Sequence, residues 1–339
     1  NELMVKMDAR ELLNRYTKGD KNFSNQTLVG IDLSGTDLIG INLSHSNLEG
    51  SNLAFAFFNE ANFTRCNLVR AKLSGINLSQ ANLRFANLHD SDFHGAILHR
   101  TNLVDANLTL ASLLDSNLME ANLSGADLSG ADLSGVCLLG AIFISSEQRG
   151  SRKSSTKLKR TNLRRADLES LYLDELDFTQ ANLTEANLVR ATLTKSILQG
   201  ADLSEANLFN ADLSKANLKG ANLRGANLIR ANLERADLSG ADLRGAYLNE
   251  AKMFEANLDN VNLSQANLQQ ARMIRASFKH ANFSNGNLTE ANLRQADLAR
   301  ANLTNANLHN ADLTGADLNS TNWTNVNLEG VILPDGMTP

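Results

Sequence analysis

A five-residue repeat runs through almost the whole chain of 339 residues. From Phe23 to Phe143, 25 consecutive fifth positions are Leu or Phe, and from Leu158 to Leu333 another 36 are Leu, Phe, Met or Trp. A period of five fits neither the 3.6-residue turn of an α-helix nor the two-residue alternation of a strand. The chain must therefore turn a corner in each repeat, with the apolar centre pointing inward.

Two other positions of the repeat are regular. A small residue, usually Ala, lies two residues before each centre, and Asn or Asp usually lies immediately before it. Of the 21 glycines, 18 have numbers divisible by five, and 17 of these lie two residues after a centre, where a tight turn would use their conformational freedom. Only 5% of the residues are aromatic, which suits a narrow interior filled by Leu and Ala. The pattern predicts an all-β solenoid in which neighbouring coils satisfy one another's backbone groups.

Written as A(N/D)LXX, the repeat resembles that of the pentapeptide repeat family. This resemblance implies a right-handed quadrilateral parallel β-helix with four pentapeptides per coil. On that basis we expect about six coils in a first arm, residues 21–143, and about nine in a second arm, residues 158–335. Residues 1–20 would form an N-terminal cap, and residues 336–339 a short tail.

Both ends carry further signals. Asp8 with Glu11 three residues later is typical of a capping box, Leu12 supplies an apolar face, and Gly19 is a stop signal. We therefore expect a short helix that covers the first coil. At the other end Pro334 terminates the ladder with no predicted helix. That end is interpreted either as a homodimerisation edge or as an edge blunted by proline.

The repeat fails over residues 144–157. The in-phase positions would be Gln148 and Lys153, and a buried unpaired lysine is costly. We expect this segment to leave the solenoid as a basic loop next to residues 101–143, which hold five acids and no Lys or Arg. Two interpretations stay open: the loop is a solvated insertion that screens the acidic stretch, or it grips an acidic partner. Its cations, in and just after the segment, are Arg149, Arg152, Lys153, Lys157, Lys159 and Arg160.

Departures from the repeat mark one place on the second arm. Residues 20 apart should stack on consecutive coils, so residues 251–255 should lie beside residues 271–275. In both pentapeptides a cation replaces Asn or Asp, the centre is Met, and an apolar residue follows it. An exposed apolar pair with a charged rim is typical of a binding hot spot, although single surface apolar residues are also ordinary. The residues concerned are Lys252, Phe254, Arg272, Ile274 and Arg275.

A second stack of apolar residues, Val189, Phe209 and Ile229, is interpreted either as a binding stripe or as support for pairing between coils.

The sequence offers no convincing catalytic or metal-binding constellation. Three histidines, His89, His94 and His99, are five residues apart, so they should point from different faces and not reach one zinc ion at about 2.0–2.1 Å. Cys66 and Cys137 should lie several coils apart, too far for a disulfide. We predict no enzymatic activity, no cofactor and no metal.

Charge and hydropathy limit the partners. A net charge of −5 and a pI of about 5.7 argue against direct binding of nucleic acid. No apolar run of about 18 residues occurs and the first residues do not form a secretory signal, so we expect a cytoplasmic protein with no membrane association.

These features predict a non-enzymatic scaffold that binds a protein partner through its faces and its basic loop. Residues 11–16 and 333–336 resemble those of cyanobacterial pentapeptide repeat proteins, some of which regulate heterocyst differentiation by binding transcription regulators. The resemblance implies a transcription regulator as partner. An alternative comes from the fluoroquinolone-resistance branch, whose members mimic DNA and bind DNA gyrase. The acidic stretch favours that alternative, whereas the mixed charges of the second arm argue against it.

Overall fold

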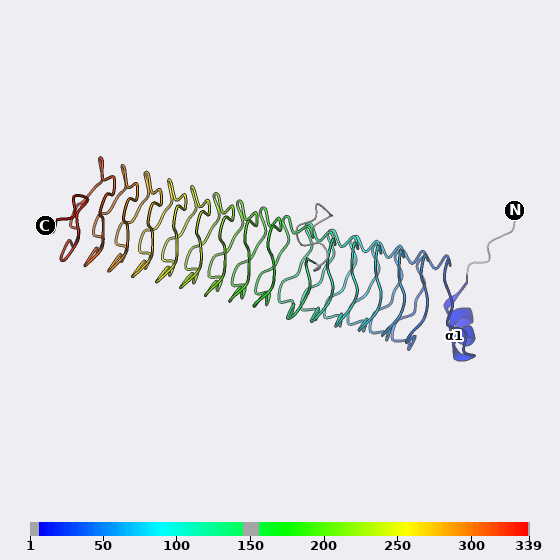
Figure 1. The fold of residues 1–339 in the computed structure, drawn as a ribbon. Helices are drawn as coiled ribbons and strands as arrows, with labels where there is room; N and C mark the ends of the chain where they lie inside the picture. The colour runs from blue at the N-terminus through cyan, green and yellow to red at the C-terminus, as the bar shows by residue number, and fades with distance from the viewer. Residues whose placement is uncertain (1–6, 145–155, 338–339) are drawn as a thin grey trace. The chain divides into compact units, whose positions relative to one another are not determined.

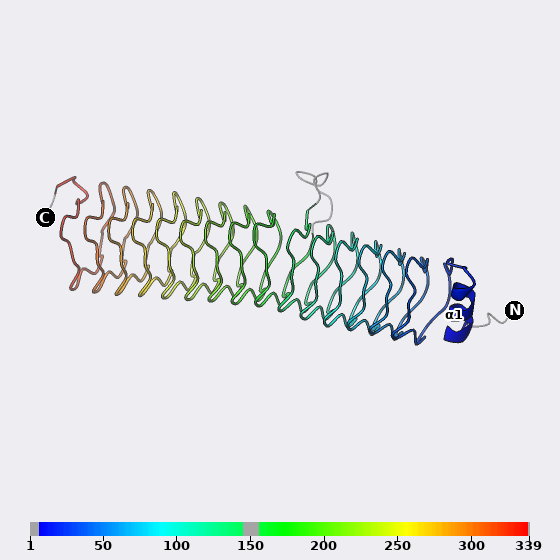
Figure 2. The same cartoon turned by 90° about the horizontal axis from the view of Figure 1, so that it is seen from below.

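The computed structural model describes residues 7–144 and 156–337. The chain forms two compact units, Asn1–Asp167 and Leu168–Pro339, which are described separately. In each unit, parallel β-bridges join residues one coil apart, such as Asn22 with Asn42 and Asn222 with Asp242 (Figures 1 and 2). The predicted right-handed quadrilateral β-helix with four pentapeptides per coil is therefore confirmed. Within the described ranges each bridge is isolated, one residue per face, and no longer strand forms.

The ladder between coils uses the backbone of every pentapeptide. In unit 2, the N–H of Leu223 donates to the carbonyl of Asp242 in the following coil at 2.7 Å. The N–H of Asn222 donates the other way, to the carbonyl of Ala201 in the preceding coil at 2.9 Å. Because the repeat length matches one face, the same two bonds recur throughout and leave few buried backbone groups without a partner.

The corner explains the remaining positions of the repeat. The N–H of Ala226 donates to the carbonyl of Leu223 at 3.1 Å and closes a turn in which Gly225 has φ +64°, as a type II turn requires. The N–H of Arg224, which the ladder does not use, donates to Oδ1 of Asn222 at 3.2 Å. Where Asn or Asp lies before the centre, it can thus satisfy the spare turn amide, a role suited to these short polar side chains.

Glycine is not required at every corner. The structure has 42 non-glycine residues with positive φ among the residues described, each two positions after a centre. For an L residue that conformation costs roughly 1–2 kcal/mol. The ladder bonds on both sides hold each corner in place despite this cost.

The N-terminal cap forms as predicted. Helix α1 spans Ala9–Thr17, and the N–H of Glu11 donates to Oδ1 of the N-cap residue Asp8 at 2.8 Å. Leu12 is fully buried, and the hydroxyl of Tyr16 donates to the carbonyl of Ile39 at 2.9 Å. Figures 1 and 2 both show α1 against the first coil. The helix therefore shields the apolar interior at this end of unit 1.

The repeat resumes earlier than the sequence suggested. Asp127 pairs with Lys157 and Cys137 with Asp167, so the interruption adds the length of two pentapeptides between bridge partners. Thr156 is already buried, and its hydroxyl lies 2.9 Å from the carbonyl of Leu123. The expected loop boundary at residue 157 is therefore corrected: Lys157 is a bridge residue, because Thr156 is small enough for the inward position and satisfies a carbonyl there.

In the last described coil of unit 2, the inward residues Leu318, Trp323, Leu328 and Leu333 are only half-buried. In the described ranges, no helix is long and apolar enough to cross a membrane.

Candidate protein-interaction surface

The surface predicted on unit 2 is called the basic patch and consists of Lys252, Phe254, Arg272, Ile274 and Arg275. Lys252 and Arg272 are bridge partners on consecutive coils, as expected, and both are exposed. Within the described ranges, neither makes an ion pair. Two neighbouring cations without a carboxylate create a local positive potential that would attract an acidic partner.

The apolar part of the basic patch is less exposed than predicted. Phe254 and Ile274 are both half-buried. The guanidinium groups of Arg235 and Arg275 lie 5.8 Å and 5.9 Å from the centre of the Phe254 ring. Both arginines also bind Glu255, at 2.9 Å and 3.1 Å. The expectation of an openly exposed pair is therefore wrong, because cation–π contacts and a shared carboxylate hold two arginines against the ring.

The predicted loop cations have different outcomes. Arg149, Arg152 and Lys153 lie outside the described residues. Lys157 lies on the coil, where its Nζ is 3.0 Å from Oδ2 of Asp127. Lys159 and Arg160 follow on the same coil, with Arg160 at a corner of φ +56°. Lys157, Lys159 and Arg160 therefore belong to the β-helix surface and not to a projecting loop.

The acidic stretch of unit 1 is partly neutralised. Burial opposes ionisation of Asp127, but hydrogen bonds from Ser129 and Lys157 outweigh it and hold the pKa of Asp127 below its usual value. Arg100 lies 2.6 Å from Glu120 and lowers the pKa of that carboxyl in the same direction. Cations thus engage two of the five acids in residues 101–143. The stretch is therefore less similar to the row of DNA phosphates that a DNA mimic would imitate.

The structure also places two further groupings, the histidines and the second apolar stack. The imidazole Nδ1 of His89 lies 2.8 Å from the hydroxyl of Thr109, and the described residues contain no cluster of three or more groups suited to a metal. Val189, Phe209 and Ile229 follow one another on consecutive coils, each half-buried.

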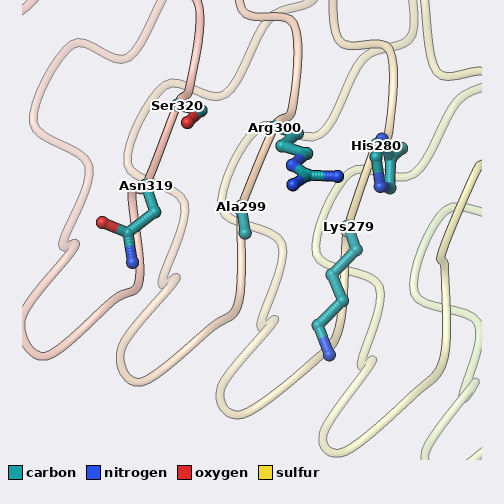
Figure 3. Close-up of a pocket in the computed structure, with 6 residues that line it drawn as sticks. All are labelled: Lys279, His280, Ala299, Arg300, Asn319 and Ser320. Carbon is teal, nitrogen blue, oxygen red and sulfur yellow. The ribbon is translucent and has the colours of Figure 1, made fainter.

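A shallow depression of about 350 Å³ lies along one edge of unit 2. Figure 3 shows Arg300 extending toward His280, whereas Lys279 points away from both. Lys279 is engaged with Asp297 at 3.2 Å, and the hydrogen bond raises the pKa of this lysine. The remaining lining residues are Ala299, Asn319 and Ser320, and all but Ala299 are exposed. No nucleophile and base are paired in this depression.

A comparison with known protein families agrees with the five-residue geometry of the coil. The sequence profile of the pentapeptide repeats matches in overlapping segments from residue 22 to 140, 154 to 254 and 256 to 333. The chain belongs to the pentapeptide repeat family. No curated protein is significantly similar in sequence.

Several solved structures are similar to this pentapeptide repeat protein. HetL, a pentapeptide repeat protein involved in heterocyst differentiation regulation from the cyanobacterium Nostoc sp. Strain PCC 7120, is 29% identical, with 98% of this chain and 100% of that chain covered and a TM-score of 0.39. A pentapeptide repeat protein from the Arabidopsis thaliana thylakoid lumen is 31% identical over 34% of this chain and 63% of that chain, with a TM-score of 0.20. Full-length QnrB1, a plasmid-mediated fluoroquinolone resistance protein, is 18% identical over 63% and 92%, with a TM-score of 0.22.

One surface of this pentapeptide repeat protein was missed by the sequence analysis. Phe55 and Phe57 in unit 1 are 69% and 50% exposed, and neither is a centre of the repeat. The available signal was positional: Phe55 lies at a corner, where small or polar residues predominate in this chain.

The two cysteines of this pentapeptide repeat protein should differ in reactivity. Cys66 is buried, its Sγ lies 2.8 Å from the carbonyl of Leu43, and burial raises the pKa of the thiol to about 12. Cys137 is half-buried at an outward bridge position. Because only the thiolate is nucleophilic, a thiol reagent at pH 8 should label Cys137 and leave Cys66 unmodified until urea unfolds the protein. Mass-spectrometric peptide mapping measures this, and equal labelling of both thiols in the folded protein would contradict it.

Proposed function

We propose that this protein is a non-enzymatic regulatory scaffold that binds an acidic protein partner through the basic patch of unit 2. The observation that carries the proposal is the pair Lys252 and Arg272, exposed on consecutive coils and without an ion-pair partner in the described part of the chain. A partner carboxylate is the group that such a pair binds best.

The apolar residues support the same assignment. Phe254 and Ile274 stay half-buried beside the cations, so a partner side chain can exclude water from the charge pairs by packing on them. Arg235 and Arg275 share one carboxylate, Glu255, which leaves donor capacity for a second acidic group. A rigid ladder presents these groups with little ordering cost on binding.

For the class of partner we retain the transcription regulator implied by residues 11–16 and 333–336, which resemble heterocyst-regulating members of the family. The DNA-mimic alternative, which would bind gyrase, receives less support. It rests on the acidic stretch of unit 1, where Glu120 and Asp127 are held by Arg100 and Lys157.

The test compares three forms of the full chain as bait in affinity capture, with quantitative mass spectrometry. In one form the patch is reversed by Lys252→Glu and Arg272→Glu. In a matched control, Arg224→Glu and Arg244→Glu reverse two exposed cations on consecutive coils of another face. We expect an acidic transcription regulator to be captured by the unaltered chain and the control, and its yield to fall about tenfold or more with the reversed patch.

Three results would overturn the proposal: equal recovery of the regulator with all three baits, equal loss with both variants, or recovery of gyrase subunits in place of a regulator. A further bait with residues 149–155 replaced by Gly and Ser measures the contribution of the loop cations separately.

A further inference from the structure

One face of unit 1 carries exposed aromatic and aliphatic side chains that the proposed function does not use. Phe57 and Ile97 belong to the same ladder, joined through Asn77, and are 50% and 41% exposed. Phe55 lies at the corner two residues before Phe57 and is 69% exposed. One coil earlier Asp37 holds the ladder position, and Ile39, two residues after Asp37, is 38% exposed. We call Ile39, Phe55, Phe57 and Ile97 the aromatic face. Asn77 separates Phe57 from Ile97, so Phe55 and Phe57 form the centre of this surface, and an exposed apolar patch rimmed by polar residues marks an interaction site.

Phe55 lies at a corner whose backbone conformation glycine adopts more easily than phenylalanine. Its φ is +58°, the left-handed region, whereas the same corner in the adjacent coils is glycine at positions 35 and 75. A Cβ on Gly75 would lie only 2.5 Å from the Phe55 ring, so the ring rests where a side chain on the next coil would be. Positive φ is common to the corners of this coil, so the feature that matters at Phe55 is its largely exposed ring, which lies against Gly75 and is available to a partner.

Phe85, another exposed aromatic residue of unit 1, is covered by cations. The guanidinium groups of Arg65 and Arg84 lie 4.7 Å and 5.2 Å from the centre of the Phe85 ring, at a different corner of unit 1. No described cation lies over Phe55 or Phe57. These two rings are therefore open to a partner without displacement of an existing cation–π contact.

The charges around the aromatic face select the partner. Asp37 is the bridge partner of Phe57, and Glu60 follows Phe57 by three residues. Both acids are exposed, and within the described ranges neither makes an ion pair. The nearby ammonium of Lys21 is bound to the carbonyl of Ile39 at 2.8 Å. Residues 1–143 as a whole carry 10 basic and 15 acidic groups.

We propose that the aromatic face is a second docking site, which binds a protein segment presenting apolar side chains flanked by lysine or arginine. The apolar side chains pack on Phe55 and Phe57, and the flanking cations pair with Asp37 and Glu60. A second copy of the chain fits less well, because pairing this face with itself would place its acidic rim against an identical rim. The site has the opposite rim charge to the basic patch and lies on the other unit, so it stands independently of the proposed function.

The test uses the full chain and three fluorescent synthetic peptides with the same central Leu-Phe-Leu segment, flanked by Lys, Ser or Glu, in an anisotropy titration. We expect the Lys-flanked peptide to bind about tenfold or more tighter than the Glu-flanked peptide. The double variant Phe55→Gly with Phe57→Thr should weaken its binding about tenfold or more. Glycine suits the positive φ at residue 55, so this variant should unfold at the same or a higher temperature.

Phe85→Ser is the matched control and should leave the affinity unchanged, because this ring lies at another corner under two arginines. The proposal is overturned if the Lys-flanked and Glu-flanked peptides bind equally, or if binding persists in the double variant, which would reduce the effect to net charge. Concentration-dependent self-association that the double variant abolishes would also overturn it, since a second copy would then be the occupant.

Discussion

Leu243→Ala is expected to lower the free energy of unfolding of unit 2 by about 2–5 kcal/mol. Leu243 is fully buried, and its N–H donates to the carbonyl of Asn262 in the next coil at 2.7 Å. The ladder fixes the backbone on every side of the lost side chain, so the coil cannot collapse to fill the cavity and most of the cavity cost is retained. Urea unfolding followed by circular dichroism measures the change.

Leu328→Ala provides the comparison for this prediction. Leu328 is also a centre of the repeat, but it is only half-buried in the last described coil. Among the described residues it has a neighbouring coil on one side alone, so its removal should cost less than about 1 kcal/mol. Equal losses from the two substitutions would show that position along the solenoid does not govern the packing energy.

Thr156→Val is expected to destabilise unit 1 by about 1–3 kcal/mol, although valine has nearly the same shape. The hydroxyl of Thr156 lies 2.9 Å from the carbonyl of Leu123 and 2.6 Å from that of Phe143, and the residue is fully buried where the repeat resumes. Valine removes the donor to the carbonyl of Phe143, whereas the carbonyl of Leu123 keeps the N–H of Ala126 at 2.9 Å. Amide hydrogen exchange at Leu128 and Lys157, which face each other across the interruption, measures the loss of protection locally.

The control is a threonine whose hydroxyl has no partner. The Oγ1 of Thr192 is buried and makes no hydrogen bond in the described structure. Thr192→Val should therefore leave stability unchanged or raise it, because a desolvated hydroxyl is replaced by a methyl group. A loss in Thr192→Val as large as that in Thr156→Val would mean that the hydrogen bond at residue 156 is not the cause.

The interior could be predicted from the sequence because one simple rule determines it. An apolar centre in every pentapeptide, with a small residue two before it, leaves a narrow tube as the consistent solution, and Leu223 and Leu243 are buried as this rule requires. Stacking at intervals of four pentapeptides also placed Lys252 beside Arg272. Both predictions depend on the backbone alone, which repeats without variation.

The exposure of the surface side chains could not be predicted in the same way. Long flexible side chains reach beyond their own pentapeptide, so Arg235, one coil before Glu255, covers part of Phe254. Phe55 was overlooked because almost any residue type occurs at a corner of the repeat, whereas its importance comes from its exposed ring and the glycine beside it. The end of the interruption was misplaced because charge suggested a loop, while Thr156 already occupies an inward position.

The extra chain length between Asp127 and its bridge partner Lys157 has a consequence for how such chains tolerate insertions and deletions. That extra length equals two whole pentapeptides, so Leu158 and Leu163 remain inside. An insertion within the coil that is not a whole number of pentapeptides would turn the interior residues outward, as a one-residue slip does in an ordinary strand. One pentapeptide added within the coil itself would keep the interior but carry every later side chain one quarter-turn around the axis. Length changes within the coil must therefore be whole pentapeptides to keep the interior residues inside, and whole coils to keep each later side chain on its own face.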